Sequence, residues 1–316
     1  MLCVRSNATP RLRPSLTMTP DTVACTRCQK TGKLLFVARD LNRGVTTEPF
    51  PYYACAACGL VFLYPIPADL PRYYPADYHY YPNSIDELLA SANVHERYKI
   101  EILRRFVPAG DVLEIGPGVG GFAVLAKQAG YRLRVIEVNE RCCAFIRSTL
   151  GIDTVHTFDE VGALSREQPV DVIALWQVLE HLPDPFRLLE VAADRLKPGG
   201  TLVVAMPNPE SIQFRLLGAR WVHLDAPRHV VLIPQRLLLE VAARLGLEPL
   251  LVTTRDSGSI AWNRFGWEYS LPNVFPRRSR PRMMSIGRRV GRLARFVDDG
   301  EGRGSAYTAV LRKATA

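Results

Sequence analysis

Three glycines in the segment VLEIGPGVGGF (residues 112–122) have the spacing of a nucleotide-binding loop. Gly116, Gly118 and Gly121 follow a run of apolar residues and precede a helix-like one. Such spacing lets backbone come close to a ligand or to a packed helix, where a Cβ atom would clash. The glycines alone do not distinguish a dinucleotide site from another nucleoside site.

Two carboxylates narrow that choice. Glu114 stands two residues before the first glycine, and Glu137 ends the next strand-like run. An acidic residue at the place of Glu137 is suited to binding ribose hydroxyls. A carboxylate at the place of Glu114 is awkward beside a pyrophosphate, but useful beside a positively charged ligand. The pair therefore favours a nucleoside with a ribose and a cationic end, although each carboxylate alone could be a solvated strand end.

Two C-x-x-C pairs can supply a metal site. Cys25 with Cys28 and Cys55 with Cys58 flank strand-like runs at 33–40 and 50–55. Four thiolates in two such pairs suit one tetrahedral structural zinc, with no open position for catalysis. We interpret the segment as a zinc ribbon. A disulfide framework or a redox pair is the weaker alternative, because no secretory signal is evident and no helix follows a cysteine pair.

Candidate acid–base residues lie in two segments. His181 follows a buried strand pattern in EHLPDP, and it can act as a base, orient a ligand, or only cap or pack. In the long loop WVHLDAPRH, His229 is the first candidate base, with Asp225 as its partner and Arg228 as a clamp for phosphate or carboxylate. Trp221 lies in the same loop and can line an acceptor pocket, or it can pin the loop to the sheet.

A segment rich in tyrosine and proline (64–82) carries six tyrosines and five prolines, which exclude a continuous helix. It is either a linker whose rings pack on neighbouring domains or a cover over a ligand, with Tyr73, Tyr74, Tyr78 and His79 as candidate contacts.

A basic segment (272–297) holds eight arginines and no acidic residue, in a chain of net charge +9, so the remainder is nearly neutral. Its apolar residues have helical spacing. It can contact an anionic membrane over 277–295, meet a phosphorylated or lipid-linked acceptor, or form a solvated face.

The elements that position these residues alternate between strand and helix patterns. Strand patterns lie at 111–116, 132–138, 170–177, 201–207, 247–255 and 305–313, and helix patterns begin at 86 and fill 120–130, 141–151, 185–200 and 234–246. This alternation predicts an α/β fold with a doubly wound, mostly parallel sheet. The last strand is expected to run antiparallel, reached through an irregular basic segment. We expect a disordered tail (1–20), a zinc ribbon (21–63), a linker or lid (64–95) and one large domain (96–316).

Taken together and in this order, VLEIGPGVGGF, VIEVNE, FDEV, VDVIALWQVLEHLPDP and LKPGGTLVVAMPN resemble a class I S-adenosylmethionine-dependent methyltransferase. The cysteine pairs, the tyrosines and WVHLDAPRH resemble a bacterial subgroup with an N-terminal zinc ribbon. The resemblance implies a seven-stranded sheet of order 3-2-1-4-5-7-6. It also implies a donor site formed by Glu114, Gly116, Gly118, Glu137, Val138, Thr157, Phe158, Leu175, Trp176 and Gln177.

The expected acceptor is a small molecule or glycan, methylated on oxygen or carbon. A binding or scaffold protein without transfer chemistry is the alternative. A nucleic-acid methyltransferase is less favoured, because the fourth strand ends in LWQVLEH and lacks an N/D-P-P-Y type motif. Seven cysteines without a secretory signal indicate a cytoplasmic protein that starts at Met1 or Met18.

Overall fold

The computed structural model describes residues 19–75 and 77–315. The expected tail lies almost wholly outside these residues, as do Cys3 and Met18. No helix within the described ranges combines the length and apolarity that crossing a bilayer requires.

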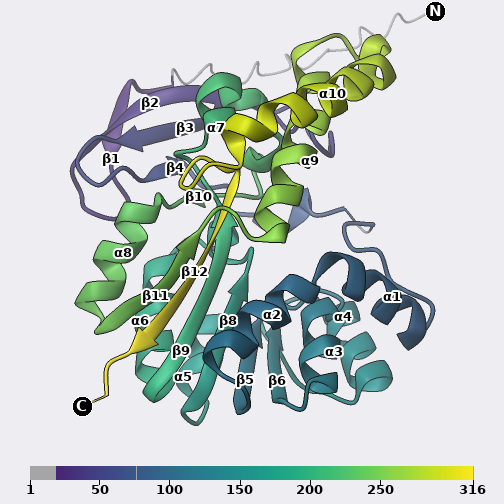
Figure 1. Ribbon diagram of the computed structural model, residues 1–316. Helices are drawn as coiled ribbons and strands as arrows, with labels where there is room; N and C mark the ends of the chain where they lie inside the picture. The colour runs from purple at the N-terminus through teal and green to yellow at the C-terminus, as the bar shows by residue number, and fades with distance from the viewer. Residues whose placement is uncertain (1–18, 76, 316) are drawn as a thin grey trace, which may run out of the picture.

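A seven-stranded sheet forms the centre of the fold, in the order β11-β12-β9-β8-β5-β6-β7 (Figure 1). Its strands are β5 (Asp111–Ile115), β6 (Arg132–Glu137), β7 (Asp153–His156), β8 (Val170–Trp176), β9 (Leu196–Pro207), β11 (Leu247–Thr253) and β12 (Ala306–Lys313). Strand β12 runs antiparallel to both β11 and β9, whereas the pairs among the other strands are parallel. The predicted fold class, strand order and antiparallel last strand are confirmed.

Helices cover both faces of this sheet, because alternate residues of a central strand point to opposite sides. In β8, Ile173 and Leu175 join one core, while Ala174 and Trp176 join the other. On one side lie α1 (Ile85–His95), α2 (Arg97–Phe106), α3 (Gly121–Gln128), α4 (Glu140–Phe145) and the π-helix η2 (Ile146–Leu150). On the other lie α5 (Glu160–Ser165), α6 (Pro185–Arg195) and α8 (Gln235–Arg244).

Two predicted helices have different bounds. The pattern that begins at 86 forms α1 and α2, which meet at Glu96 rather than forming one helix. The helix expected over 185–200 ends at Arg195, because Leu196 already pairs with Val170 in the sheet.

The expectation of an irregular connection before the last strand is wrong, although the helical spacing of the apolar residues in the basic segment is confirmed by α10 (Arg280–Asp298). Residues between β11 and β12 form a hairpin of two long helices, α9 (Ser257–Val274) and α10, joined through the 3-10 turn η6 (Arg277–Ser279). Helix α9 lacks an apolar stripe because it packs against α10 and against the 3-10 turns that follow β9. Its periodicity is therefore weak in the sequence.

A second sheet contains the four cysteines. Its strands are β1 (Thr22–Ala24), β2 (Thr31–Ala38), β3 (Phe50–Cys55), β4 (Val61–Leu63) and β10 (Val231–Leu232). Strand β10 comes from the loop after β9 and pairs antiparallel with β4. Buried ribbon residues such as Tyr52 and Phe62 share one core with α6 and α8. The ribbon sheet is thus completed by a strand from the far half of the chain.

Several 3-10 turns and one short α-helix connect the longer elements between β4 and β12. They are η1 (Leu70–Tyr73), η3 (Leu179–His181), α7 (Ile212–Leu217), η4 (Gly218–Arg220) and η5 (Val222–Leu224). The ribbon and the α9–α10 hairpin both lie beyond the end of the sheet where the parallel strands finish (Figure 1). Ligands of open α/β sheets bind at that carboxyl edge.

Candidate functional site

The glycine loop leaves β5 at the carboxyl edge and leads directly into α3. Gly116, Gly118 and Gly120 all have positive φ angles, of 67°, 56° and 84°. A Cβ atom on Gly116 would lie 2.8 Å from a methyl group of Val178, and one on Gly120 would lie 2.9 Å from Leu150. The loop therefore needs glycine both for its backbone conformation and for its close packing.

Glu137 ends β6 and its carboxylate lies against this loop. The carboxylate accepts hydrogen bonds from the backbone N–H groups of Gly118 (3.0 Å) and Asn139 (2.7 Å). Burial raises the pKa of Glu137, and the two amides oppose that rise. The fold thus brings Glu137 next to the glycine loop, although helix α3 separates them in the sequence.

Glu114 lies beneath the loop in a different environment. Burial raises the pKa of its carboxyl to about 8, and Lys99 on α2 opposes the rise. One oxygen of Glu114, the Trp176 Nε1 and the Gln177 Oε1 are buried with no hydrogen-bond partner among the described residues. Buried polar atoms are normally paired, so three of them at adjoining strand ends fit a polar ligand. The ion pair of Lys99 with Glu96 borders this site and was not anticipated.

The other expected donor residues differ in their exposure. Thr157 and Phe158 follow β7 at the same edge, and Phe158 is 74% exposed. The Val138 carbonyl accepts a hydrogen bond from His156 Nε2 at 3.1 Å. The Leu175 side chain is buried in the core on the α5–α6 side, so only its backbone is available to a ligand at the strand end.

A cluster of acid–base side chains lies where β8 and the long loop after β9 meet. Glu180, His181 and His229 each place one oxygen or nitrogen atom within 4.8 Å of the others, and the two imidazole centroids are 4.6 Å apart. Glu180 is fully buried, and neither of its oxygens has a partner among the described residues. Glu180 was not among the residues expected at the site, although its place beside His181 after a buried strand was a usable signal.

Burial fixes the charge state of this cluster. It lowers the pKa of His181 to about 3 and also lowers the pKa of His229, so both imidazoles are neutral near pH 7. Burial raises the pKa of Glu180 to about 8, with a smaller contribution from Asp225, which favours the protonated acid.

Hydrogen bonds determine which nitrogen of each ring can accept a proton. His229 Nδ1 faces the His223 carbonyl at 2.8 Å, and His181 Nδ1 faces the Arg228 carbonyl at 3.1 Å. A carbonyl oxygen only accepts, so in each neutral ring Nδ1 carries the hydrogen and Nε2 holds the lone pair. Both Nε2 atoms are therefore available as bases.

The tyrosine-rich segment links this cluster to the glycine loop. The Tyr74 hydroxyl lies 3.0 Å from His181 Nδ1, and the ring of Tyr74 contacts Tyr78, whose ring in turn contacts His79. His79 lies against Gly118, 3.4 Å from the position of a Cβ atom there. These rings form a continuous row from the acid–base cluster to the donor loop. Tyr73 lies apart, because its hydroxyl donates to Glu48 of the ribbon region.

Three residues expected at an acceptor pocket instead make buried structural contacts. Arg228 is fully buried and forms ion pairs with Asp40 (2.7 Å) and Asp225 (2.8 Å). Burial would raise the pKa of Asp225, but its hydrogen bonds and ion pair with Arg228 lower that pKa to about 2. Trp221 is buried and its indole N–H donates to Gln213. The Arg228 guanidinium is thus already paired, and it joins the ribbon to the loop that carries His229.

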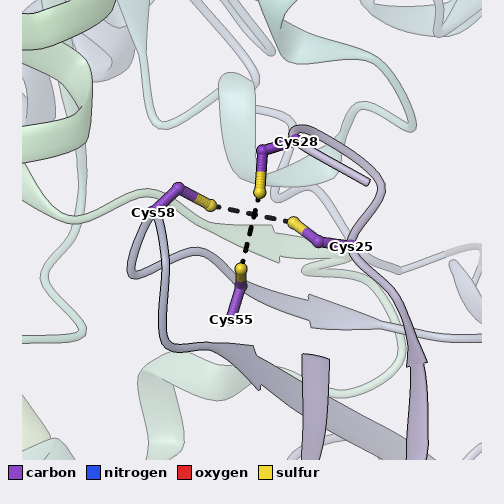
Figure 2. Close-up of side chains that lie close together, drawn as sticks. All are labelled: Cys25, Cys28, Cys55 and Cys58. Atoms are coloured by element: carbon purple, nitrogen blue, oxygen red, sulfur yellow. Dashed lines mark hydrogen bonds between the residues drawn. The ribbon is translucent and has the colours of Figure 1, made fainter. Parts of the chain in front are cut away.

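The four ribbon cysteines converge on one point (Figure 2). Cys25 and Cys58 have their sulfurs 3.7 Å apart, and those of Cys28 and Cys55 are 3.6 Å apart. A disulfide would need about 2.05 Å. A zinc ion with four sulfurs at about 2.3 Å in a tetrahedron separates them by about 3.8 Å. The thiols therefore fit a closed metal site and not a disulfide pair.

Known proteins resemble the part of the chain that forms most of the central sheet. Residues 90–252 match the model of a family described as methyltransferase domain. Ubiquinone biosynthesis O-methyltransferases of Ruegeria pomeroyi and Nitrosospira multiformis are 32% and 30% identical to the chain, over 40% and 37% of its length. The alignments cover 50% and 52% of those enzymes, so the chain spans about half the length of the curated relatives it matches.

A solved structure supports the fold. A putative sarcosine dimethylglycine methyltransferase from Galdieria sulphuraria superposes with a TM-score of 0.50 at 16% identity, covering 75% of this chain and 92% of that one. With this family model matched over half of its residues, the chain belongs to the methyltransferase domain family.

Proposed function

We propose that this protein transfers a methyl group from S-adenosylmethionine to a hydroxyl group of a small-molecule acceptor. The observation that carries the proposal is the row of rings from Tyr74 to His79, which joins the donor loop to a buried pair of neutral histidines. Bound S-adenosylmethionine would supply an activated methyl group on a sulfonium. The chain's own task is to position both partners and to accept a proton.

On the donor side, Glu137 would accept hydrogen bonds from the ribose hydroxyls while its backbone contacts hold the carboxylate in place. Glu114 and the loop glycines would hold the methionine end. The unpaired polar atoms of Trp176 and Gln177 are suited to the same end of the ligand. Val138, Thr157 and Phe158 would border the adenine.

On the acceptor side, His229 Nε2 is our first candidate for the base, and His181 Nε2 lies close enough to share that role. A neutral imidazole near pH 7 can take a proton from a hydroxyl as it is methylated. Protonated Glu180 would donate a hydrogen bond inside the same cluster, and Tyr74 and Tyr78 would line the acceptor.

The names of the curated relatives favour transfer to oxygen. Small molecules with a hydroxyl group are therefore our first acceptor class, followed by sugars and surface glycans, and carbon is the alternative methylated atom. Zinc held by Cys25, Cys28, Cys55 and Cys58 would serve folding, because a four-thiolate site has no open coordination position.

Calorimetry tests the donor half. S-adenosylmethionine and its demethylated product should bind the wild-type chain, and Glu137→Gln should weaken binding by about 1.5–3 kcal/mol, or roughly 10- to 150-fold. Glu140→Gln, an exposed carboxylate in the first turn of α4, is the matched control and should bind like wild type. Binding of a nicotinamide dinucleotide without any binding of S-adenosylmethionine would refute the proposal.

A labelled methyl donor then identifies the acceptor. Phenols, nucleotide sugars and glycans are incubated with the enzyme, and the position of the label in each product is determined. Donor binding without methylation of any acceptor class would favour a non-catalytic binding protein instead.

A further inference from the structure

The α9–α10 hairpin presents a surface that lies outside the candidate site described above. Helix α10 packs on α9 through Gly287, where a Cβ atom would lie 2.5 Å from the Trp267 carbonyl oxygen. At the far end of α10, buried Asp298 accepts hydrogen bonds from Trp267 Nε1 (2.5 Å) and Gln213 Nε2 (3.1 Å). The inner face of α10 is thus held against α9, which fixes the direction of its outer face.

The outer face of α10 combines positive charge with exposed apolar side chains. Its members follow helical spacing on the side opposite Gly287, and they are Arg282, Arg289, Arg292, Leu293 and Phe296. Leu293 is 74% exposed and Phe296 is 76% exposed. Arg288 is paired with Glu268. Among the described residues, no carboxylate lies within ion-pair distance of the three arginines of the outer face.

We propose that the outer face of α10 docks on the surface of an anionic phospholipid bilayer. A helix with arginines and with Leu or Phe on the same exposed face can pair lipid phosphates with its cations and bury its apolar groups at the headgroup boundary. Val274 and Phe275, at the turn between the two helices, are 42% and 48% exposed and add apolar area at the tip of the hairpin.

The same residues argue against nucleic acid and against a second copy of the chain as the partner of this face. Nucleic acid would pair with the arginines but would leave Leu293 and Phe296 in water, and the nearly neutral remainder of the chain offers no extended basic surface. A second copy of the chain would set one arginine-rich face against another, which like-charge repulsion opposes. An anionic bilayer satisfies both the charge and the apolar groups.

Vesicle co-sedimentation tests the proposal without a methyl donor, so its result is independent of the proposed function. Wild-type protein should sediment with vesicles of equal parts phosphatidylglycerol and phosphatidylcholine at low salt, and not with vesicles of phosphatidylcholine alone. Arginines near an anionic surface contribute about fivefold each, so Arg289→Gln with Arg292→Gln should weaken binding about 25-fold. Leu293→Ser with Phe296→Ser should weaken it about tenfold or more.

A control double variant changes one exposed apolar residue and one exposed arginine outside α10. Val94→Ser with Arg244→Gln alters a 75% exposed valine on α1 and an exposed arginine on α8, and it should bind vesicles like wild type. All variants change exposed side chains, so the thermal unfolding midpoints should match that of wild type.

Three outcomes would overturn the proposal. The first is wild-type protein that does not sediment with the anionic vesicles. The second is loss of duplex DNA binding in the arginine variant while vesicle binding is unchanged, which would indicate nucleic acid. The third is a fall in sedimentation mass in the Leu293 and Phe296 variant with unchanged vesicle binding, which would indicate self-association.

Discussion

The proposed donor half and the proposed acceptor half of the site are built in different ways. The centre of the donor half comes from one strand–helix–strand unit, in which Glu114, the glycine loop and Glu137 are close in sequence, and residues at the ends of β7 and β8 complete it. The acceptor half joins segments that are far apart, because Tyr74, His181 and His229 meet only in the folded chain. Local spacing therefore defines the first half, and tertiary packing defines the second.

The two halves also differ in what holds them. Backbone amides hold Glu137 in the donor half. In the acceptor half, the buried ion pairs of Arg228 with Asp40 and Asp225 join the His229 loop to the ribbon, and the Tyr52 hydroxyl donates to the His229 carbonyl at 2.7 Å. We infer that the acceptor half depends on the ribbon, whereas the donor half does not.

Removing the metal should separate the halves most strongly. Cys28→Ser should reduce zinc content from one equivalent to none and open the ribbon, because structural zinc contributes about 10–16 kcal/mol to folding in small zinc domains. Hydrogen exchange should increase in β1–β4 and around His229, while the affinity for S-adenosylmethionine holds.

Cys142→Ser is the control, since Cys142 is a buried thiol outside the cluster and its replacement should leave zinc content unchanged. The outcome that would contradict this prediction is purified wild-type protein that lacks metal and holds the four ribbon cysteines in disulfides. That result would refute both the zinc ribbon and the dependence of the acceptor half on it.

Removing the base should divide the halves by function. His229→Ala should lower turnover by about 10²–10⁴-fold while donor affinity is unchanged, because the imidazole acts only on the acceptor's proton. Steady-state kinetics with an identified acceptor and calorimetry with the donor measure the two effects. His95→Ala, an exposed histidine at the end of α1, is the control. Normal turnover of His229→Ala would show that His229 is not the base. The base would then be His181, or catalysis would need only the positioning of donor and acceptor.

The smallest expected effect is a change of folding stability with pH, which concerns Glu180 in the acceptor half. Because burial raises the folded pKa of Glu180 to about 8 against an ordinary value of 4.5, the folded state is favoured most below pH 4.5, where Glu180 is protonated in both states, and loses stability as the pH rises from 4.5 to 8. The stability of wild type relative to Glu180→Gln should therefore fall by about 1.4 kcal/mol for each pH unit within that window. Urea unfolding at several pH values measures this slope, and parallel curves for the two proteins would show that Glu180 is not buried as an acid.

The sequence predicted the central sheet because six of its seven strands and most of its helices have regular apolar patterns, whereas the short strand β7 was implied only by the family resemblance. Helix α9 was not predicted, because its residues contact neighbours on more than one side and so form no single apolar stripe. Arg228 was expected to clamp an acceptor, because nothing in the sequence near it shows that Asp40 reaches it from the ribbon. Glu180 was passed over for a similar reason, because its burial depends on residues far away in the chain.

The pairing of β10 with β4 has a consequence for exchanging parts between methyltransferases. Although the ribbon precedes the large sheet in the chain, its last strand is supplied by Val231 and Leu232. A shortened chain that begins at Ser84 would leave β10 as an unpaired edge and the Arg228 guanidinium without Asp40. A ribbon transplanted alone would likewise lack its fifth strand. Recombination between relatives can therefore preserve both pieces only when the ribbon and the loop around His229 are inherited together.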